Sequence, residues 1–247
     1  NDEMGDFYCE DLTSNNVDTN LSPGDHEEGI TGKCLVMTTP DAERTMHTYL
    51  GITANYSNKE IAIEALRESD YLYIEGYLVA GDHSRAAMIE AKQLAEQNDV
   101  KTALTFSDPS MVKYFRDQMA EVVGAGVDLL FCNEEEALLY TETATIEKAQ
   151  ESLKYIAKSF VVTLGPKGAL VFDGNNTYSI QPFETNAVDT NGAGDLFAGA
   201  FLYGITHGKS FEEAGTLASL AASKVVSKFG PRLSAEQASE LHLQLFG

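Results

Sequence analysis

The segment from Val188 to Ala200 reads VDTNGAGDLFAGA and joins an extended stretch to a helical pattern through two glycines, Gly192 and Gly194. Glycine allows the backbone to approach a bound group closely. Successive N–H groups at the start of a helix form a nest that holds an anion, and the helix dipole strengthens it. The segment therefore predicts a strand-to-helix connection that binds a phosphate group.

Asp195 lies inside this predicted nest. An isolated aspartate in a first helical turn is usually only a charge that suits the helix dipole. The neighbouring glycines favour a chemical role, in which Asp195 takes the proton from a hydroxyl that attacks a bound phosphoryl group. In that role the N–H groups of the nest stabilise charge on the transferred group; they belong to Gly192, Ala193 and Gly194.

Elsewhere in the chain, short apolar runs alternate with helical patterns. The predicted strands are 71–76, 101–106, 127–132, 160–164 and, antiparallel to the last, 169–172. The predicted helices are 5–15, 58–69, 84–98, 110–123, 146–157, 192–207 and 211–228. This alternation is typical of βαβ units, and it predicts an α/β fold with a doubly wound, mostly parallel sheet. The ligand is then expected at the carboxyl ends of the strands.

Two extended runs, 33–39 and 44–50, flank a turn and predict a β-hairpin. Residues 20–29 are loop by composition. We therefore expect an α/β nucleotide-binding and catalytic domain over 1–28 and 52–247, with a small β-hairpin lid over 29–51.

Composition excludes several kinds of partner. The 247 residues are 43% hydrophobic, as in an ordinary globular protein, and no apolar run is long enough for a membrane span. The net charge of −21 argues against nucleic acid or an anionic membrane as a partner. It leaves a phosphate ligand open, because backbone N–H groups bind phosphate whatever the global charge.

Three cysteines far apart, without a CxxC pair, argue against a zinc site or a disulfide framework. The acidic start of the chain has no apolar stretch behind it and predicts no signal peptide. Both observations favour a cytoplasmic protein.

The stretch 189–195, DTNGAGD, matches the D-T-x-G-A-G-D signature of the ribokinase-like (PfkB-type) family of carbohydrate and nucleoside kinases. Three further stretches resemble family motifs in family order: NEEE at 133–136, TLGPKG at 163–168, and GPR at 230–232 followed by Ser234. The resemblance covers essentially the whole chain. It implies transfer of the γ-phosphoryl group of ATP, with Mg²⁺, to a hydroxymethyl group of a sugar or nucleoside.

The resemblance also implies a role for each matching position. Asp195 would be the catalytic base, beside the anion hole already described. Asn133 and Glu136 would position magnesium, largely through water. The residues that would bind ATP are Thr163, Gly165, Gly168 and Gly230, and those that would contribute to a K⁺ site are Asp189, Asn191, Gly230 and Ser234.

The predicted hairpin resembles the family's lid, and its tip is most similar to bacterial adenosine kinase-type members. Arg44 would then reach the substrate or its phosphates, although a solvated strand charge is an equal alternative. Adenosine or a related nucleoside is the favoured acceptor, with ribose, fructose or a keto-deoxy sugar acid open, and a monomer and a homodimer both fit. The resemblance further implies a preceding strand, a glycine-rich substrate loop and an early aspartate before Asn1.

Other interpretations compete with this one. Asn133 is also a favoured helix cap, and Gly165 and Gly168 are also ordinary turn residues. A dinucleotide-binding oxidoreductase is disfavoured because the third glycine, Gly199, is misplaced, and a P-loop kinase because no GxxxxGK[ST] occurs. A nucleotide-binding descendant of the kinase fold without catalysis stays open.

Overall fold

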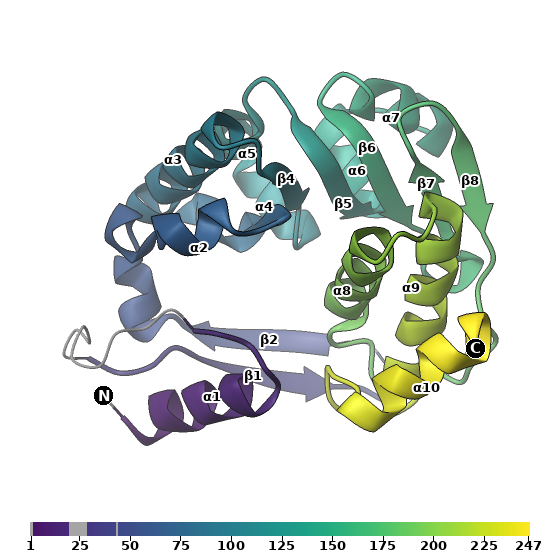
Figure 1. Ribbon diagram of the computed structural model, residues 1–247, viewed down its shortest axis with the longest axis horizontal. Coiled ribbons are helices and arrows are strands. Elements are labelled where there is room, and N and C mark those ends of the chain that lie inside the picture. Colours follow the sequence, from purple (N-terminus) through teal and green to yellow (C-terminus); the bar gives the residue numbers. More distant parts are fainter. Residues whose placement is uncertain (1, 20–28, 43) are drawn as a thin grey trace.

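The computed structural model describes residues 2–19, 29–42 and 44–247. Its centre is a six-stranded sheet in the order β3-β4-β5-β6-β7-β8 (Figure 1). Strands β3 to β6 are parallel, and β7 and β8 continue the sheet antiparallel. Their bounds are Tyr71–Glu75, Lys101–Thr105, Val127–Asn133, Ala157–Thr163, Ala169–Phe172 and Thr177–Ile180. The expected mostly parallel sheet is therefore confirmed.

Helices cover both faces of this sheet (Figure 1). Helices α3 to α7 pack on one face over a core that includes Leu104 and Phe160. Helices α8 and α9 pack on the other face, where Phe201 is fully buried near Phe131. The α-helices are α1 Glu3–Ser14, α2 Ile63–Arg67, α3 Asp82–Gln97, α4 Pro109–Tyr114, α5 Arg116–Val123, α6 Glu134–Thr141, α7 Ile146–Leu153, α8 Ala193–Thr206, α9 Phe211–Val225 and α10 Ala235–Phe246. Successive side chains of a strand point to opposite faces, so the two cores use alternate strand residues.

The hairpin lies apart from the central sheet, as Figure 1 shows. Strands β1 (Lys33–Thr38) and β2 (Arg44–Tyr49) pair with each other antiparallel and form a separate two-stranded sheet. Most of their side chains are exposed, including those of Leu35 and Met37. The predicted hairpin is confirmed, while its assignment as a lid over 29–51 stays a prediction. Most of the predicted loop 20–29 lies outside the described residues.

Some predicted helices differ from those observed. The predicted helix 58–69 consists of a short 3-10 turn, Asn58–Glu60, and then α2, because the backbone is extended at Ile61. The predicted helix 110–123 is interrupted at Phe115, whose φ of −128° is not helical. Strand β8 and helix α10 were not predicted from the sequence.

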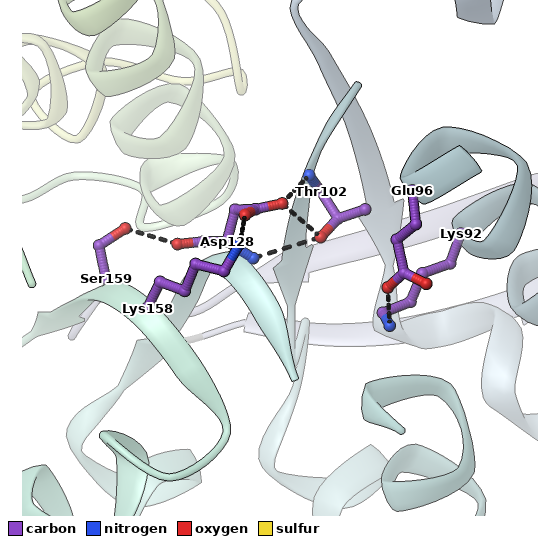
Figure 2. Close-up of polar contacts among 6 residues, drawn as sticks. All are labelled: Lys92, Glu96, Thr102, Asp128, Lys158 and Ser159. Carbon is purple, nitrogen blue, oxygen red and sulfur yellow. Dashed lines mark hydrogen bonds and ion pairs between the residues drawn. The ribbon is translucent and has the colours of Figure 1, made fainter. Parts of the chain in front are cut away.

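A polar network ties together the amino ends of three parallel strands (Figure 2). Asp128 Oδ2 accepts hydrogen bonds from the backbone N–H of Thr102 (2.7 Å) and from its hydroxyl (3.1 Å). Lys158 Nζ lies 2.7 Å from Asp128 Oδ1, and Ser159 donates to the carbonyl of Asp128 at 2.6 Å. Burial works to raise the pKa of Asp128, but the bonds from Lys158 and Thr102 outweigh it and hold this pKa below its usual value. The network thus joins β4, β5 and β6 at the sheet edge opposite the motif residues.

None of the helices in the described part of the chain is both long enough and apolar enough to cross a membrane.

Candidate active site

Two of the predicted motifs begin at the carboxyl ends of neighbouring parallel strands. Asn133 ends β5 and Thr163 ends β6, and the two are paired in register. The motifs 133–136 and 163–168 therefore begin side by side. Helix α6 follows Asn133 directly, and the loop with Gly165 follows Thr163. This is the edge at which doubly wound sheets bind ligands.

Gly192 caps α8 in the left-handed conformation, with φ of 76°. A Cβ atom at this position would lie 2.5 Å from Cβ and 2.6 Å from the carbonyl oxygen of Pro231. The close approach therefore requires glycine. The contact between Gly192 and Pro231 packs the loop containing Gly230 and Pro231 against the turn that starts α8.

Gly194 lies in the first turn of α8, and its surroundings differ from those of Gly192. Apart from its chain neighbours and the backbone of α8, a Cβ atom built at Gly194 would meet no atom of the described residues within 4 Å, and the φ of Gly194 is not in the left-handed region. Neither close packing nor backbone conformation requires glycine there. The open space next to a helix N-terminus fits a phosphoryl group, which N–H groups and the helix dipole attract. The N–H of Ala193 closes the turn by donating to the carbonyl of Thr190 at 3.3 Å.

Asp195 follows this space and is exposed. Its charge acts on groups at the carboxyl end of β3. Burial raises the pKa of Glu75, and the charge of Asp195 adds to the rise. Burial also raises the pKa of Tyr77 to about 12, and the negative charges of Asp108 and Asp195 contribute. Glu75 and Tyr77 therefore belong to the surroundings of Asp195.

Neither Glu75 nor Tyr77 is among the site residues predicted from the sequence. Glu75 ends β3, and it accepts a hydrogen bond from the hydroxyl of Ser107 at 3.1 Å. Ser107 has a φ of 68°, an uncommon conformation for a residue other than glycine. Their sequence signal is a place at the end of a predicted strand: Glu75 is within 71–76, Tyr77 follows it directly, and Ser107 follows 101–106.

Asn133 and Glu136 form a reciprocal cap at the start of α6. Glu136 Oε2 accepts from the backbone N–H of Asn133 and Oε1 from its side-chain amide, both at 2.9 Å. Burial raises the pKa of Glu136 to about 7, against the opposing effect of the Asn133 N–H bond. The helix-cap alternative for Asn133 is thus confirmed. Each carboxylate oxygen keeps a further lone pair, so a magnesium role through water stays open as a prediction.

The two glycines of the loop after β6 also differ. Gly168 has a φ of 92°, and a Cβ atom there would lie 2.0 Å from the carbonyl oxygen of Ile180. The turn itself therefore requires Gly168. Gly165, with a φ of 58°, has no other atom within 4 Å of its Cβ position, which leaves space for a ligand. Lys167 of this loop lies 3.6 Å from Glu134 of α6.

Asp189 is a buried carboxylate held by neutral donors. Its Oδ1 accepts from the N–H of Asn191 (3.0 Å) and the hydroxyl of Thr38 (3.3 Å), and its Oδ2 from the N–H of Gly230 (3.1 Å). The Asn191 bond is the largest cause that lowers the pKa of Asp189. Three residues predicted for a K⁺ site are therefore together. The side chain of Ser234 caps α10, accepting from Gln237 N–H at 3.2 Å.

The remaining predicted residue, Arg44, is at the start of β2 and is exposed. Its Nη1 donates to the hydroxyl of Thr190 at 3.2 Å. The hairpin tip thus reaches the signature segment. Within the described residues, no group of three or more His, Cys, Asp or Glu side chains is arranged to hold a metal ion.

The fold is a doubly wound α/β sheet, and its candidate site includes the open helix start at Gly194. Residues 1–238 match the pfkB family carbohydrate kinases, and the chain belongs to that family.

Three comparisons illustrate the relationship. The adenosine kinase of Sinorhizobium meliloti has 32% sequence identity and a TM-score of 0.92, over 99% of this chain and 75% of that one. The adenosine kinase of Saccharomyces cerevisiae is 28% identical over 226 residues, 85% of this chain, which spans 65% of that relative's length. A candidate Ribokinase II from E. coli, solved with ATP and Mg²⁺, shares the fold with a TM-score of 0.86 at 21% identity, over 99% of this chain and 80% of that one.

Proposed function

We propose that the chain transfers the γ-phosphoryl group of ATP to a hydroxymethyl group of a small nucleoside or sugar. The observation that carries this proposal is the open space at Gly194, directly before Asp195 and at the start of α8. The packing of the protein does not require glycine at this position or at Gly199, but only Gly194 lies at a helix start, where a bound anion is a reason for the open space. A phosphoryl group there would lie beside a carboxylate able to act as a base.

In this reaction Asp195 takes the proton from the attacking hydroxyl, which makes the oxygen a better nucleophile. The turn from Gly192 to Gly194 stabilises the charge on the transferred group. Asn133 and Glu136 would hold Mg²⁺ through water, and the ion would neutralise phosphate charge when bound. The loop with Thr163 and Gly165 holds the nucleotide, together with Gly168 and Gly230.

Asp189 would hold a K⁺ ion next to this turn together with Asn191, Gly230 and Ser234. A buried carboxylate and backbone oxygens are the hard ligands that such a cation requires. The ion would compensate a carboxylate whose described hydrogen-bond donors are all neutral.

Adenosine is the acceptor that we favour, because two of the relatives described above are named adenosine kinases. A sugar is the second candidate, favoured by the family's description as carbohydrate kinases. We place the enzyme in the cytoplasm, where Cys9, Cys34 and Cys132, which are free thiols, stay reduced. A monomer and a homodimer both fit this function.

The test is ADP release by the complete gene product, with Mg²⁺ and K⁺, across a panel of nucleosides and simple sugars. We expect adenosine to stimulate release and Asp195→Asn to abolish it. Stimulation by a sugar alone would favour the second candidate. ATP binding without release for any acceptor would contradict the proposal and favour a nucleotide-binding descendant without catalysis.

A further inference from the structure

The tip of the β1–β2 hairpin contacts the signature segment directly. Thr38 donates its hydroxyl to Asp189 Oδ1 at 3.3 Å, and Arg44 Nη1 donates to Thr190 Oγ1 at 3.2 Å. The carbonyl oxygen of Ala42 accepts from the hydroxyl of Thr190 at 2.9 Å and from its N–H at 3.4 Å. Two segments far apart in sequence are thus joined by four hydrogen bonds.

Thr190 is central to this contact because its hydroxyl both donates and accepts a hydrogen bond. A threonine hydroxyl has one proton to donate and lone pairs to accept. It donates to Ala42 and accepts from Arg44. The backbone of the same residue belongs to the anion-binding turn, since its carbonyl accepts from the N–H of Ala193 at 3.3 Å. Thr190 therefore connects the hairpin to the turn that starts α8.

The burial of Ala42 shows that the hairpin packs against the signature segment at its tip and not along its strands. Ala42 is only 3% exposed, whereas most side chains of the two hairpin strands are exposed. Its φ is 65°, a conformation that costs about 1 kcal/mol or more for a residue with a Cβ atom and persists only where surrounding contacts hold it. The bonds from Thr190 to the Ala42 carbonyl are contacts of that kind.

We propose that Thr190 is a positioning residue that fastens the hairpin tip to the anion-binding turn, so that hairpin docking and turn orientation occur together. When the tip leaves, Arg44 and Thr38 leave with it, and Asp189 loses one of its hydrogen-bond donors. The docked tip contacts Thr190 at the start of the turn, so its loss frees the turn to move away from the orientation that phosphoryl transfer needs. The catalytic consequence rests on the proposed function, whereas the docking contact does not.

The first test is hydrogen exchange of the hairpin amides, 33–42 and 44–49, in the full chain. Thr190→Val keeps the side-chain shape and removes both hydroxyl contacts, and Thr190→Ser restores a hydroxyl. Thr206→Val is the matched control, because the Thr206 hydroxyl bonds only within its own end of α8. We expect exchange about 10-fold faster in Thr190→Val, equivalent to about 1.4 kcal/mol, and near wild type in the other two. Unchanged protection in Thr190→Val would overturn the proposal.

A second variant keeps the test decisive if Thr190→Val is poorly folded. Thr38→Val removes a contact from the hairpin side, away from the turn, and is expected to increase exchange in the same amides. Thermal unfolding of each variant separates global destabilisation from local undocking. Faster exchange that extends evenly through the central sheet would contradict a local contact.

The kinetic test measures ADP release with and without acceptor. In Thr190→Val we expect kcat with acceptor to fall about 10-fold, the KM for ATP to change less than about 2-fold, and the acceptor-independent share of ADP release to rise. Faster hairpin exchange with unchanged kinetics would refute the positioning role. If wild type releases no ADP with any acceptor, the proposed function fails, and the exchange experiment still decides whether Thr190 fastens the hairpin.

Discussion

Replacing Gly194 by alanine is expected to change the stability of the fold and the affinity for nucleotide in opposite directions. The fold gives no reason for glycine at this position, since an added Cβ would meet no other atom within 4 Å. Alanine in a helix is favoured over glycine by about 0.5–1 kcal/mol. For a chain of 247 residues this predicts a melting temperature about 1–4 °C higher.

Nucleotide binding is expected to respond in the opposite direction. A methyl group in the open space displaces a phosphate oxygen and removes a charge-assisted hydrogen bond, worth about 1.5–3 kcal/mol. This corresponds to a loss of roughly 10- to 100-fold in affinity. Gly199 in the same helix is the matched control, because its Cβ position is also open. Gly199→Ala should therefore be stabilising as well, but with unchanged nucleotide affinity.

The assay combines thermal unfolding with titration of ADP and ATP for wild type, Gly194→Ala and Gly199→Ala. Wild-type affinity and turnover in Gly194→Ala would refute the assignment of this space to a phosphoryl group. Equal losses of affinity in the two variants would refute it too, because the effect would then belong to the helix as a whole.

Other predictions follow from packing and charge. Gly192→Ala should lower stability by about 1–3 kcal/mol because its Cβ would lie 2.5 Å from Pro231 Cβ; an unchanged melting curve would contradict this. Asp128→Asn should be less stable than wild type in urea at pH 7. Because the pKa of Asp128 is lowered in the fold, its stabilising effect is present above the unfolded value and lost as pH falls through the folded one, so the difference should shrink between about pH 5 and pH 3; a constant difference would argue against the network. Asp189→Asn should weaken activation of ADP release by K⁺, and an identical K⁺ titration would remove Asp189 from that site.

Local patterns predicted most of the sheet. Apolar runs of strand length between helical patterns were sufficient for β3 to β7, because burial on both faces leaves this pattern in the sequence. Strand β8 is short, and three of its four side chains are not buried, so its pattern is weak. Helix α10 has a local signal for its start, because Ser234 and Gln237 form a capping box, a pattern that is recognisable in sequence.

The candidate site was predictable only where its residues are close in sequence. The local sequence from Asp189 to Asp195 predicts the turn before α8, because glycines lie next to a helix start there. Glu75 and Ser107 come together because β3 and β4 end side by side, and no local pattern indicates their hydrogen bond. The contact between Ala42 and Thr190 spans 148 positions and depends on where the hairpin docks.

The most direct test of the central claim is transfer of labelled γ-phosphate from ATP to adenosine, compared between wild type and Asp195→Asn. We expect labelled nucleoside monophosphate with wild type, and a turnover roughly 10²- to 10⁴-fold lower in Asp195→Asn with nucleotide affinity retained. Equal turnover in the two proteins would contradict the role of Asp195 as the base.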